Sequence, residues 1–292
     1  MIPSSKYGLR FIDLYFNEQI PATNADVIHY RYWSEPVAHS MVASHLNVVV
    51  DLRRDAAALF AAMAKPTRYD IRRAEREGRL SFHAYIGESV PLARFVKFFN
   101  AFADAKSIHR VSQTALSILA DRKLLALTCI CKADGSELIW HAYLSTPARV
   151  RLLHSASLRV HVAEAGQGQI LARANRYHHW RDALLFRERS VSVLDLAGIC
   201  EDSCDSPALN GIRHFKTGFG GDIVRMFDCA QALSARGRTA LWLKYRLLPG
   251  MYSQWRPAAE FDREAAGKLH SLGRSSNNGS AHGSKQKTAG AA

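Results

Sequence analysis

Three segments of the chain carry side chains whose types and spacing could do chemistry. In the first, residues 66–78, Arg68, Arg72 and Arg76 recur at intervals of four. On a helix this interval places the guanidinium groups on one face, where they could bind the phosphates of a substrate. The alternative is a solvated charged face balanced by the acidic residues at 70, 75 and 77, and spacing alone favours that alternative.

The second segment, residues 174–182, is predicted to lie inside a long helix over 169–187. Its polar side chains are Asn175, Arg176, His178, His179 and Asp182. They fall on adjoining helical faces, so Asn175, Arg176 and His178 could bind substrate, and a base could lie beside a polar group that orients it. The adjacent histidines project about 100° apart, unlike two metal ligands one turn apart, so no metal is expected. The alternative is a helix that packs its aromatic residues 177 and 180 into the core.

The third segment runs from Asp195, which is expected to end a strand, to the glycine-rich stretch 218–221. Glycines lie on both sides of Phe215 and Lys216 and would let the backbone approach a ligand closely. A lysine beside a buried aromatic residue can stabilise a developing oxyanion. Taken alone, such glycines usually mark turns.

A predicted central strand adds His141 and Tyr143, which share one face of the strand because side chains alternate. Either could take a proton from an acceptor amine if this face lines a cleft. A histidine on a strand is more often a hydrogen-bonded core residue, which is the alternative interpretation.

The elements that must position these residues follow from hydrophobic patterning. Strands are predicted over 46–52, 124–132, 137–144, 149–155, 191–196 and 222–228. Helices are predicted over 55–65 (ended by Pro66), over 67–76 (capped by Thr67), from 91, and over 112–122, 169–187 and 239–248. The segment 133–136 is a hairpin turn between two of the strands. This order predicts an α/β (α+β) fold, in which a mixed sheet contains an antiparallel meander.

Three stretches, 68–78, 195–199 and 211–221, resemble in order the Fem-type branch of the GNAT acyltransferase superfamily. The resemblance spans about residues 46–225. Its most specific part is the last stretch, which contains Gly211-Ile212, Phe215-Lys216 and Gly218-Phe219-Gly220-Gly221.

The resemblance implies a GNAT-like mixed sheet flanked by helices and the transfer of an acyl group to an amine. Residues 1–79 would form a reduced N-terminal GNAT-like half, 80–250 the acyltransferase domain, and 251–292 a C-terminal extension that is disordered from about 273. In the aminoacyl ligases of this branch the lysine of the Phe-Lys pair lies in the acyl-transfer channel, which implies the same for Lys216. These ligases carry two complete domains, whereas this chain has room for one.

Members of the superfamily that use acetyl-CoA place a Gln/Arg-x-x-Gly-x-Gly/Ala motif before the helix that binds the pyrophosphate, because backbone N–H groups there meet the anion. Here Gly166, Gln167 and Gly168 precede the long helix, while Ala163 occupies the Gln/Arg position. The two glycines of the motif are thus present, and its Gln/Arg is not. Acyl-CoA is the expected donor, with Gly166, Gln167 and Gly168 as the residues that bind it.

The formal net charge of +13 favours anionic partners such as phosphates, nucleotides, tRNA or a membrane surface. No apolar run approaches the roughly 20 residues needed to span a bilayer, and the N-terminus lacks a secretory pattern. A cytoplasmic protein without a membrane span is therefore expected, and its five cysteines would be free thiols.

Together these features predict an N-acyltransferase that moves an acyl group from acyl-CoA, or a similar activated donor, to an amine of an anionic acceptor. A nucleotide-linked or lipid-linked amino sugar of cell-surface polysaccharide or peptidoglycan would suit the charge. Lys216 would stabilise the oxyanion, Asp195 or His141 would assist removal of the proton, and the three arginines would hold phosphates. Residues 200–210 are interpreted as a lid over the acceptor cleft. Two alternatives remain open: an aminoacyl-tRNA-dependent ligase and a catalytically inactive GNAT-fold binding protein.

Overall fold

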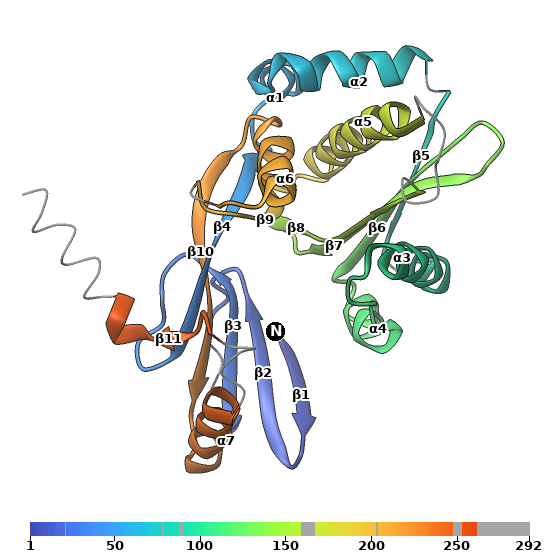
Figure 1. Cartoon of the computed structure of the whole chain (residues 1–292). Helices are drawn as coiled ribbons and strands as arrows, with labels where there is room; N and C mark the ends of the chain where they lie inside the picture. The colour runs from blue at the N-terminus through green and yellow to red at the C-terminus, as the bar shows by residue number, and fades with distance from the viewer. Residues whose placement is uncertain are drawn as a thin grey trace, which may run out of the picture. The chain divides into compact units, whose positions relative to one another are not determined.

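The computed structural model describes residues 1–20, 22–77, 79–87, 90–158, 167–202, 204–247 and 253–261 (Figure 1). The chain divides into two compact units, one made of Met1–Ser44 with Met226–Ala292 and the other of His45–Arg225. These units differ from the predicted division at residues 79 and 250. The difference arises because strands from both ends of the chain pair within the first unit, which the order of elements along the chain does not reveal.

The second unit contains a mixed sheet flanked by helices, as predicted. Its strands, in spatial order, are β4 (Met41–Asp51, from His45 onward), β9 (Val193–Ile199), β8 (Arg149–Ser157), β7 (Glu137–Ser145), β6 (Leu125–Cys131) and β5 (Ser81–Ile86). Neighbouring strands pair antiparallel except β8 and β9, which are parallel. The hairpin β6–β7 and the following strand β8 form the predicted antiparallel meander.

Helices cover both faces of this sheet. They are α1 (Ala56–Ala62), α2 (Lys65–Glu77), α3 (Leu92–Lys106), α4 (Gln113–Asp121), α5 (Gln167–Glu188) and α6 (Pro207–Thr217). Figure 1 shows α5 on one face with α2 packed outside it, and α3 and α4 on the opposite face. The sheet therefore lies between two helical layers, which bury its strands from both sides.

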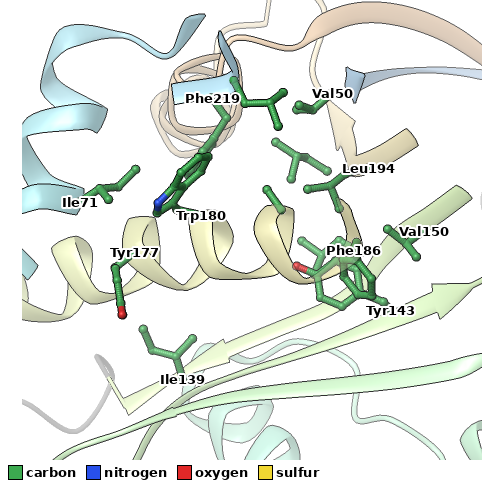
Figure 2. Packing of buried hydrophobic residues seen from close by; sticks show 14 of the residues in the cluster. Val50, Ile71, Ile139, Tyr143, Val150, Tyr177, Trp180, Phe186, Leu194 and Phe219 are labelled. Atoms are coloured by element: carbon green, nitrogen blue, oxygen red, sulfur yellow. The ribbon is translucent and has the colours of Figure 1, made fainter. Parts of the chain in front are cut away.

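The core on the α5 face is built around large side chains of this helix. Tyr177, Trp180 and Phe186 point inward and pack with Ile71 of α2 and with Phe219, which follows α6 (Figure 2). Trp180 and Tyr177 are only 8% and 6% exposed. The interpretation of 174–182 as a helix that packs its aromatic residues into the core is thus confirmed for this pair.

The core on the opposite face follows the predicted apolar stripe of α3. Phe95 and Phe99 are buried one helical turn apart and contact Trp140 of β7 and His154 of β8. Burial lowers the pKa of His154 to about 4, so this imidazole is neutral. The α3 face of the sheet is therefore an apolar layer, and the polar candidates lie elsewhere.

Two predictions about the connection from α1 to α2 are wrong. Pro66 does not end a helix but lies in the first turn of α2, where its missing N–H would have no helical partner in any case. Thr67 does not cap α2, because it is the third residue of the helix and is buried. Its hydroxyl group lies close to Gly218, where a Cβ would be 2.7 Å from the hydroxyl oxygen.

The prediction of a lid over 200–210 followed by glycine turns is also wrong in part, because helix α6 occupies residues 207–217. Ser206 is its N-cap and Pro207 its first residue, a pair that is typical of helix starts. Gly211 lies inside this helix. Lys216 is therefore presented by the last turn of a helix and not by a glycine loop.

The turn after α6 explains the most specific motif of the resemblance. Gly220 has a φ of +73°, and a Cβ at this position would lie 2.3 Å from the carbonyl oxygen of Ala62 at the end of α1. A Cβ on Gly221 would lie 2.5 Å from the carbonyl oxygen of Val49 in β4. These glycines let the end of α6 pack directly against the backbone of α1 and β4.

Replacing Gly220 by alanine should therefore lower the free energy of unfolding by about 2–4 kcal/mol, as positive-φ strain and a backbone clash combine. Chemical denaturation would measure the loss. Gly211→Ala is the matched control, because a Cβ there meets nothing within 4 Å. The control should be neutral or raise stability by up to about 1 kcal/mol, since alanine is the better helix former. Equal losses in both variants would contradict this account.

The first unit contains strands β1 (Ile2–Lys6), β2 (Leu9–Tyr15), β3 (Val27–Trp33) and β10 (Asp222–Ala232, from Met226 onward), in this spatial order. Strands β2 and β3 are parallel, and the other neighbours are antiparallel. The short strand β11 (Arg256–Pro257) pairs with Met41 and Val42, and helix α7 (Ala235–Leu247) follows β10.

The predictions for the ends of the chain have mixed outcomes. The strand over 222–228 and the helix over 239–248 are confirmed as β10 and α7, whereas β1, β2, β3 and β11 were not predicted. Of the predicted C-terminal extension only 253–261 is described, and the tail from 273 lies outside the described residues. Within the described part of the chain, every helix is too short or too polar to cross a bilayer.

Candidate active site

A cavity of about 640 Å³ in the second unit collects several of the predicted substrate-binding residues. Its walls come from α3, β8, α5 and α6, and they include Asn175, Arg176 and Phe215. The apolar part of the wall includes Phe102 and Ile212, and the polar part includes Ser155, Ser157 and Lys106. A concave, mostly apolar site with few polar groups is typical of small-molecule binding.

The charge of this cavity is positive. Lys106 and Arg176 contribute cations, and no acidic side chain is among the described residues that line it. The Arg176 guanidinium lies 5.3 Å from the centre of the Phe215 ring and 3.1 Å from the carboxylate of Asp70. These two contacts fix Arg176 in place at the wall, which suits recognition of an anionic ligand.

The predicted phosphate grip of Arg68, Arg72 and Arg76 is not seen at this cavity, since none of the three lines it. Arg68 donates to the carbonyl oxygens of Ala61, at 2.9 Å, and of Met63, and so caps the end of α1. The Arg72 guanidinium lies over the ring of Phe60, 5.1 Å from its centre. The described contacts of Arg68 and Arg72 are therefore those of structural residues.

Lys216 lies at the end of α6, directly after the cavity residue Phe215, but it is not itself among the described residues that line the cavity. Its Nζ donates a hydrogen bond of 2.7 Å to the carbonyl oxygen of Gly198 in β9. Partial burial, reinforced by the positive charge of Arg151, lowers its pKa to about 8, while Asp195 opposes the shift. Lys216 is thus a largely protonated ammonium at neutral pH that loses its charge just above it.

Asp195 was predicted to end a strand, but it is the third residue of β9 and is fully buried. Its oxygens accept hydrogen bonds from Asn47, at 2.9 and 3.0 Å, and form ion pairs with Arg149 at 2.7 Å and Arg151 at 3.1 Å. The backbone N–H of Ala197 donates a further bond. A carboxylate engaged in this way holds the two arginines in place, and Asp195 is not among the described residues that line the cavity.

The sequence analysis did not identify Asn47, Arg149 and Arg151 as candidates. The signal available for the arginines was their spacing of two on a predicted buried strand, which puts two charges on one face. Charged side chains on such a strand require a buried partner. The partner itself, Asp195, lies more than 40 residues away in the sequence.

His141 and Tyr143 are both fully buried and do not line the cavity. His141 Nδ1 lies 2.7 Å from Asp182 Oδ2, and the Tyr143 hydroxyl donates to the same oxygen, also at 2.7 Å. Burial, then the charge of Asp182, raises the pKa of Tyr143 well above its ordinary value. On its other side His141 Nε2 lies 3.2 Å from Oδ1 of Asn175, which does line the cavity.

His178 was predicted to bind substrate, but it is buried in the core. Its Nε2 lies 2.9 Å from the Thr128 hydroxyl, and its ring stacks on His141 with centroids 3.8 Å apart. Burial, followed by the charges of His141 and His179, holds the pKa of His178 well below its ordinary range. His178 is therefore a neutral core residue.

The expected CoA-binding residues fall at the start of α5. Gly166 lies outside the described residues, Gln167 is the first residue of the helix, and Gly168 is in its first turn. The helix thus begins where the predicted pyrophosphate site requires a helix N-terminus, and binding at these residues stays a prediction.

No protein-family model matches the chain, and no curated protein matches it. Solved structures do match. FemX has a TM-score of 0.52 at 10% identity, over 70% of this chain and 63% of that chain. The C-terminal (DUF2156) domain of a proposed lysylphosphatidylglycerol synthetase from Agrobacterium fabrum has a TM-score of 0.49 at 14% identity, over 74% of this chain and 70% of that chain. L-PGS from Bacillus licheniformis has a TM-score of 0.45 at 11% identity, over 76% of this chain and 73% of that chain.

The fold of the chain is therefore GNAT-like, a mixed sheet flanked by helices. FemX is a solved structure that shares this fold at 10% sequence identity. The chain spans less than two thirds of the length of FemX.

Proposed function

We propose that this protein is a transferase that moves an acyl or aminoacyl group from an activated donor to an amine. The observation that carries the proposal is Lys216, whose ammonium group is held by the Gly198 carbonyl and which follows the cavity residue Phe215 on α6. An ammonium group fixed in this way is suited to stabilise negative charge that develops on a reacting carbonyl, if the carbonyl reaches it from the cavity. The GNAT-like fold supports this reaction class by analogy.

The reaction proposed is nucleophilic acyl transfer. The neutral amine of the acceptor attacks the thioester carbonyl of acyl-CoA, a C–N bond forms, and the oxyanion is stabilised by Lys216. Collapse of this intermediate breaks the C–S bond, the CoA thiolate leaves, and the amine proton passes to water. Asp195 acts as a positioning residue through Arg149 and Arg151. His141, with Asp182, holds Asn175 at the cavity wall.

The proposed acceptor is an anionic amine, such as a nucleotide-linked or lipid-linked amino sugar, with Lys106 and Arg176 binding its phosphate. Their positive charge at the cavity supports this choice. An aminoacyl-tRNA donor is the alternative within the same reaction class. A catalytically inactive binding protein is the alternative outside this reaction class. A salt bridge that buries the Lys216 side chain would have favoured this alternative. The described hydrogen-bond partner of Lys216 is instead a backbone carbonyl.

Thermal unfolding with acetyl-CoA, longer acyl-CoAs and an aminoacyl-tRNA tests the proposal. A donor at 100 times its dissociation constant should add about 2.7 kcal/mol to the free energy of unfolding. Inorganic polyphosphate at the same ionic strength controls for non-specific binding to a basic protein. A shift with acyl-CoA identifies the donor, and mass spectrometry then detects the acylated amine. A shift with aminoacyl-tRNA alone favours the alternative donor, and no shift with either class overturns the transferase proposal.

A matched pair of variants tests the location of the site. Ile212 lines the cavity on α6, whereas Ile118 lies on α4, and both side chains are partly exposed. Ile212→Trp should fill the cavity and abolish acyl transfer to the acceptor, while Ile118→Trp should leave the rate of transfer intact. Equal rates in both variants would place the acceptor elsewhere.

A further inference from the structure

A cluster of buried polar side chains lies where α5 packs on β6 and β7. It contains His141 of β7 with His179 and Asp182 of α5, and these side chains are at most 3% exposed. We propose that these three residues bind a divalent transition-metal ion, with Zn²⁺ as the best fit. The proposal does not depend on the transferase function, because it concerns bound metal and not activity. None of the three residues lines the cavity, although His141 and Asp182 hold Asn175 at its wall.

The geometry of the three residues is close to that of a metal site. One ligand atom from each side chain lies within 4.8 Å of the other two. Tetrahedral Zn²⁺ with bonds of about 2.1 Å separates its ligand atoms by about 3.4 Å. His141 Nδ1 and Asp182 Oδ2, which are 2.7 Å apart, would therefore move apart when the ion binds, and the more distant ligand atoms would move closer. His179 and Asp182 are three residues apart and share a helical face, and β7 supplies the third ligand.

Unsatisfied polar atoms point to the same conclusion. Asp182 Oδ1 and His179 Nδ1 are buried, and neither has a hydrogen-bond partner among the described residues. Such atoms are costly in a protein interior, and a bound cation would satisfy both lone pairs at once.

Neighbouring groups would support the ligands. The Tyr143 hydroxyl donates to Asp182 Oδ2 at 2.7 Å, which fixes the orientation of the carboxylate. On the side of His141 that faces the cavity, Nε2 lies within hydrogen-bond distance of Asn175 Oδ1, at 3.2 Å. Partners of this kind orient the ligands in known metal sites. Two imidazoles and one carboxylate suit Zn²⁺ and its first-row neighbours better than Mg²⁺ or Ca²⁺, which prefer oxygen ligands alone.

The ion would tie α5 to β7 in the interior of the second unit. Because Asn175 separates His141 from the cavity, the ion would stabilise the fold and would not contact the substrate. Its presence is therefore read out by metal content, spectroscopy and thermal stability.

The experiment uses the full chain, stripped of metal with a chelator. Zn²⁺ or Co²⁺ is added to the folded protein and, because the site is buried, also during refolding. We expect one ion per chain, visible absorption bands typical of tetrahedral Co²⁺, and an unfolding midpoint raised by more than about 5 °C. His179→Gln and Asp182→Asn should each lose the bands and the shift. His83→Gln, which alters an exposed histidine of β5, should retain both.

Thiols also bind these metals, so Cys200→Ser combined with Cys204→Ser is the second control. The proposal is overturned if the wild-type chain retains no ion under either loading procedure. It is also overturned if the thiol variant loses the bands while His179→Gln keeps them. If both ligand variants fail to fold, the metal content and midpoint shift of the wild-type chain decide. Loss of acyl transfer in Ile212→Trp has no bearing on metal content or on the unfolding midpoint, so the two proposals fail separately.

Discussion

Replacement of Lys216 by methionine should reduce the rate of acyl transfer by about 10²–10³-fold, the usual cost of losing one donor to a developing oxyanion. Methionine keeps an unbranched side chain of similar length, so the volume of the side chain is largely preserved. The donor should still bind, because the ammonium group acts mainly in the transition state. Single-turnover rates measured beside donor-induced thermal shifts would separate the two effects.

Lys65→Met is the control for this variant, since Lys65 is an exposed lysine at the start of α2. Its rate should match that of the wild type. A rate for Lys216→Met within about threefold of the wild type would exclude the oxyanion role.

The pKa of about 8 gives a further readout of the same role. The Lys216 ammonium loses its proton as the pH rises through this value, so the stabilising charge is present below pH 8 and is lost above it. The Lys216→Arg guanidinium stays charged throughout. The ratio of the Lys216→Arg rate to the wild-type rate should therefore increase above pH 8, whatever the titration of the acceptor amine.

Local patterns predicted the elements of the second unit well. The hairpin β6–β7, the stripe of Phe95 and Phe99 in α3, and the long helix α5 each depend on residues close in sequence. Strands β1, β2 and β3 of the first unit were missed, and β3 pairs with β10 about 200 residues away. In the second unit β5 was missed. Helix α6 was missed because Gly211 was interpreted as a turn, although Ser206 and Pro207 mark a helix start.

The site shows the same division between local and distant information. Asn175 and Arg176 were predicted to bind substrate, and they line one cavity because helical spacing fixed the face that α5 presents. His178 of the same segment was predicted to bind substrate as well, but it is buried in the core. Phe215 lines the cavity from α6, a helix that was not predicted. The arginine spacing in α2 was equally regular, yet Arg68 and Arg72 contact a backbone carbonyl and an aromatic ring nearby. The spacing of residues shows which side chains share a helical face, but it does not show which groups that face contacts in the folded protein.

His179 and Asp182 illustrate this limit most clearly. The sequence presented two adjacent histidines, which project apart, and so indicated no metal site. The pair that shares a helical face is instead His179 with Asp182, and its third member, His141, comes from a strand about 40 residues earlier. Only the packing of α5 on β7 brings the three together.

Asp195→Ala should lower the free energy of unfolding by about 3–5 kcal/mol, as measured by chemical denaturation. The substitution deprives Arg149 and Arg151 of a buried carboxylate, and breaking a buried ion pair on one side leaves charge without its partner. Asp51→Ala is the control on the neighbouring strand β4. Its ion pair with Arg53 is exposed, so its loss should change stability little.

A second variant separates the effect of side-chain volume at position 195 on stability from the effect of the negative charge. In Asp195→Asn an amide of the same shape remains, so packing is retained while the negative charge is lost. This variant should therefore be destabilised nearly as much as Asp195→Ala, because buried arginines need a counter-charge more than they need volume. Removing this charge also removes the attraction that opposes the fall in the pKa of Lys216, so that pKa should drop below 8. If Asp195→Asn were as stable as the wild type, Asp195 would be a packing residue, and the proposed positioning of Arg149 and Arg151 beside Lys216 would be lost with it.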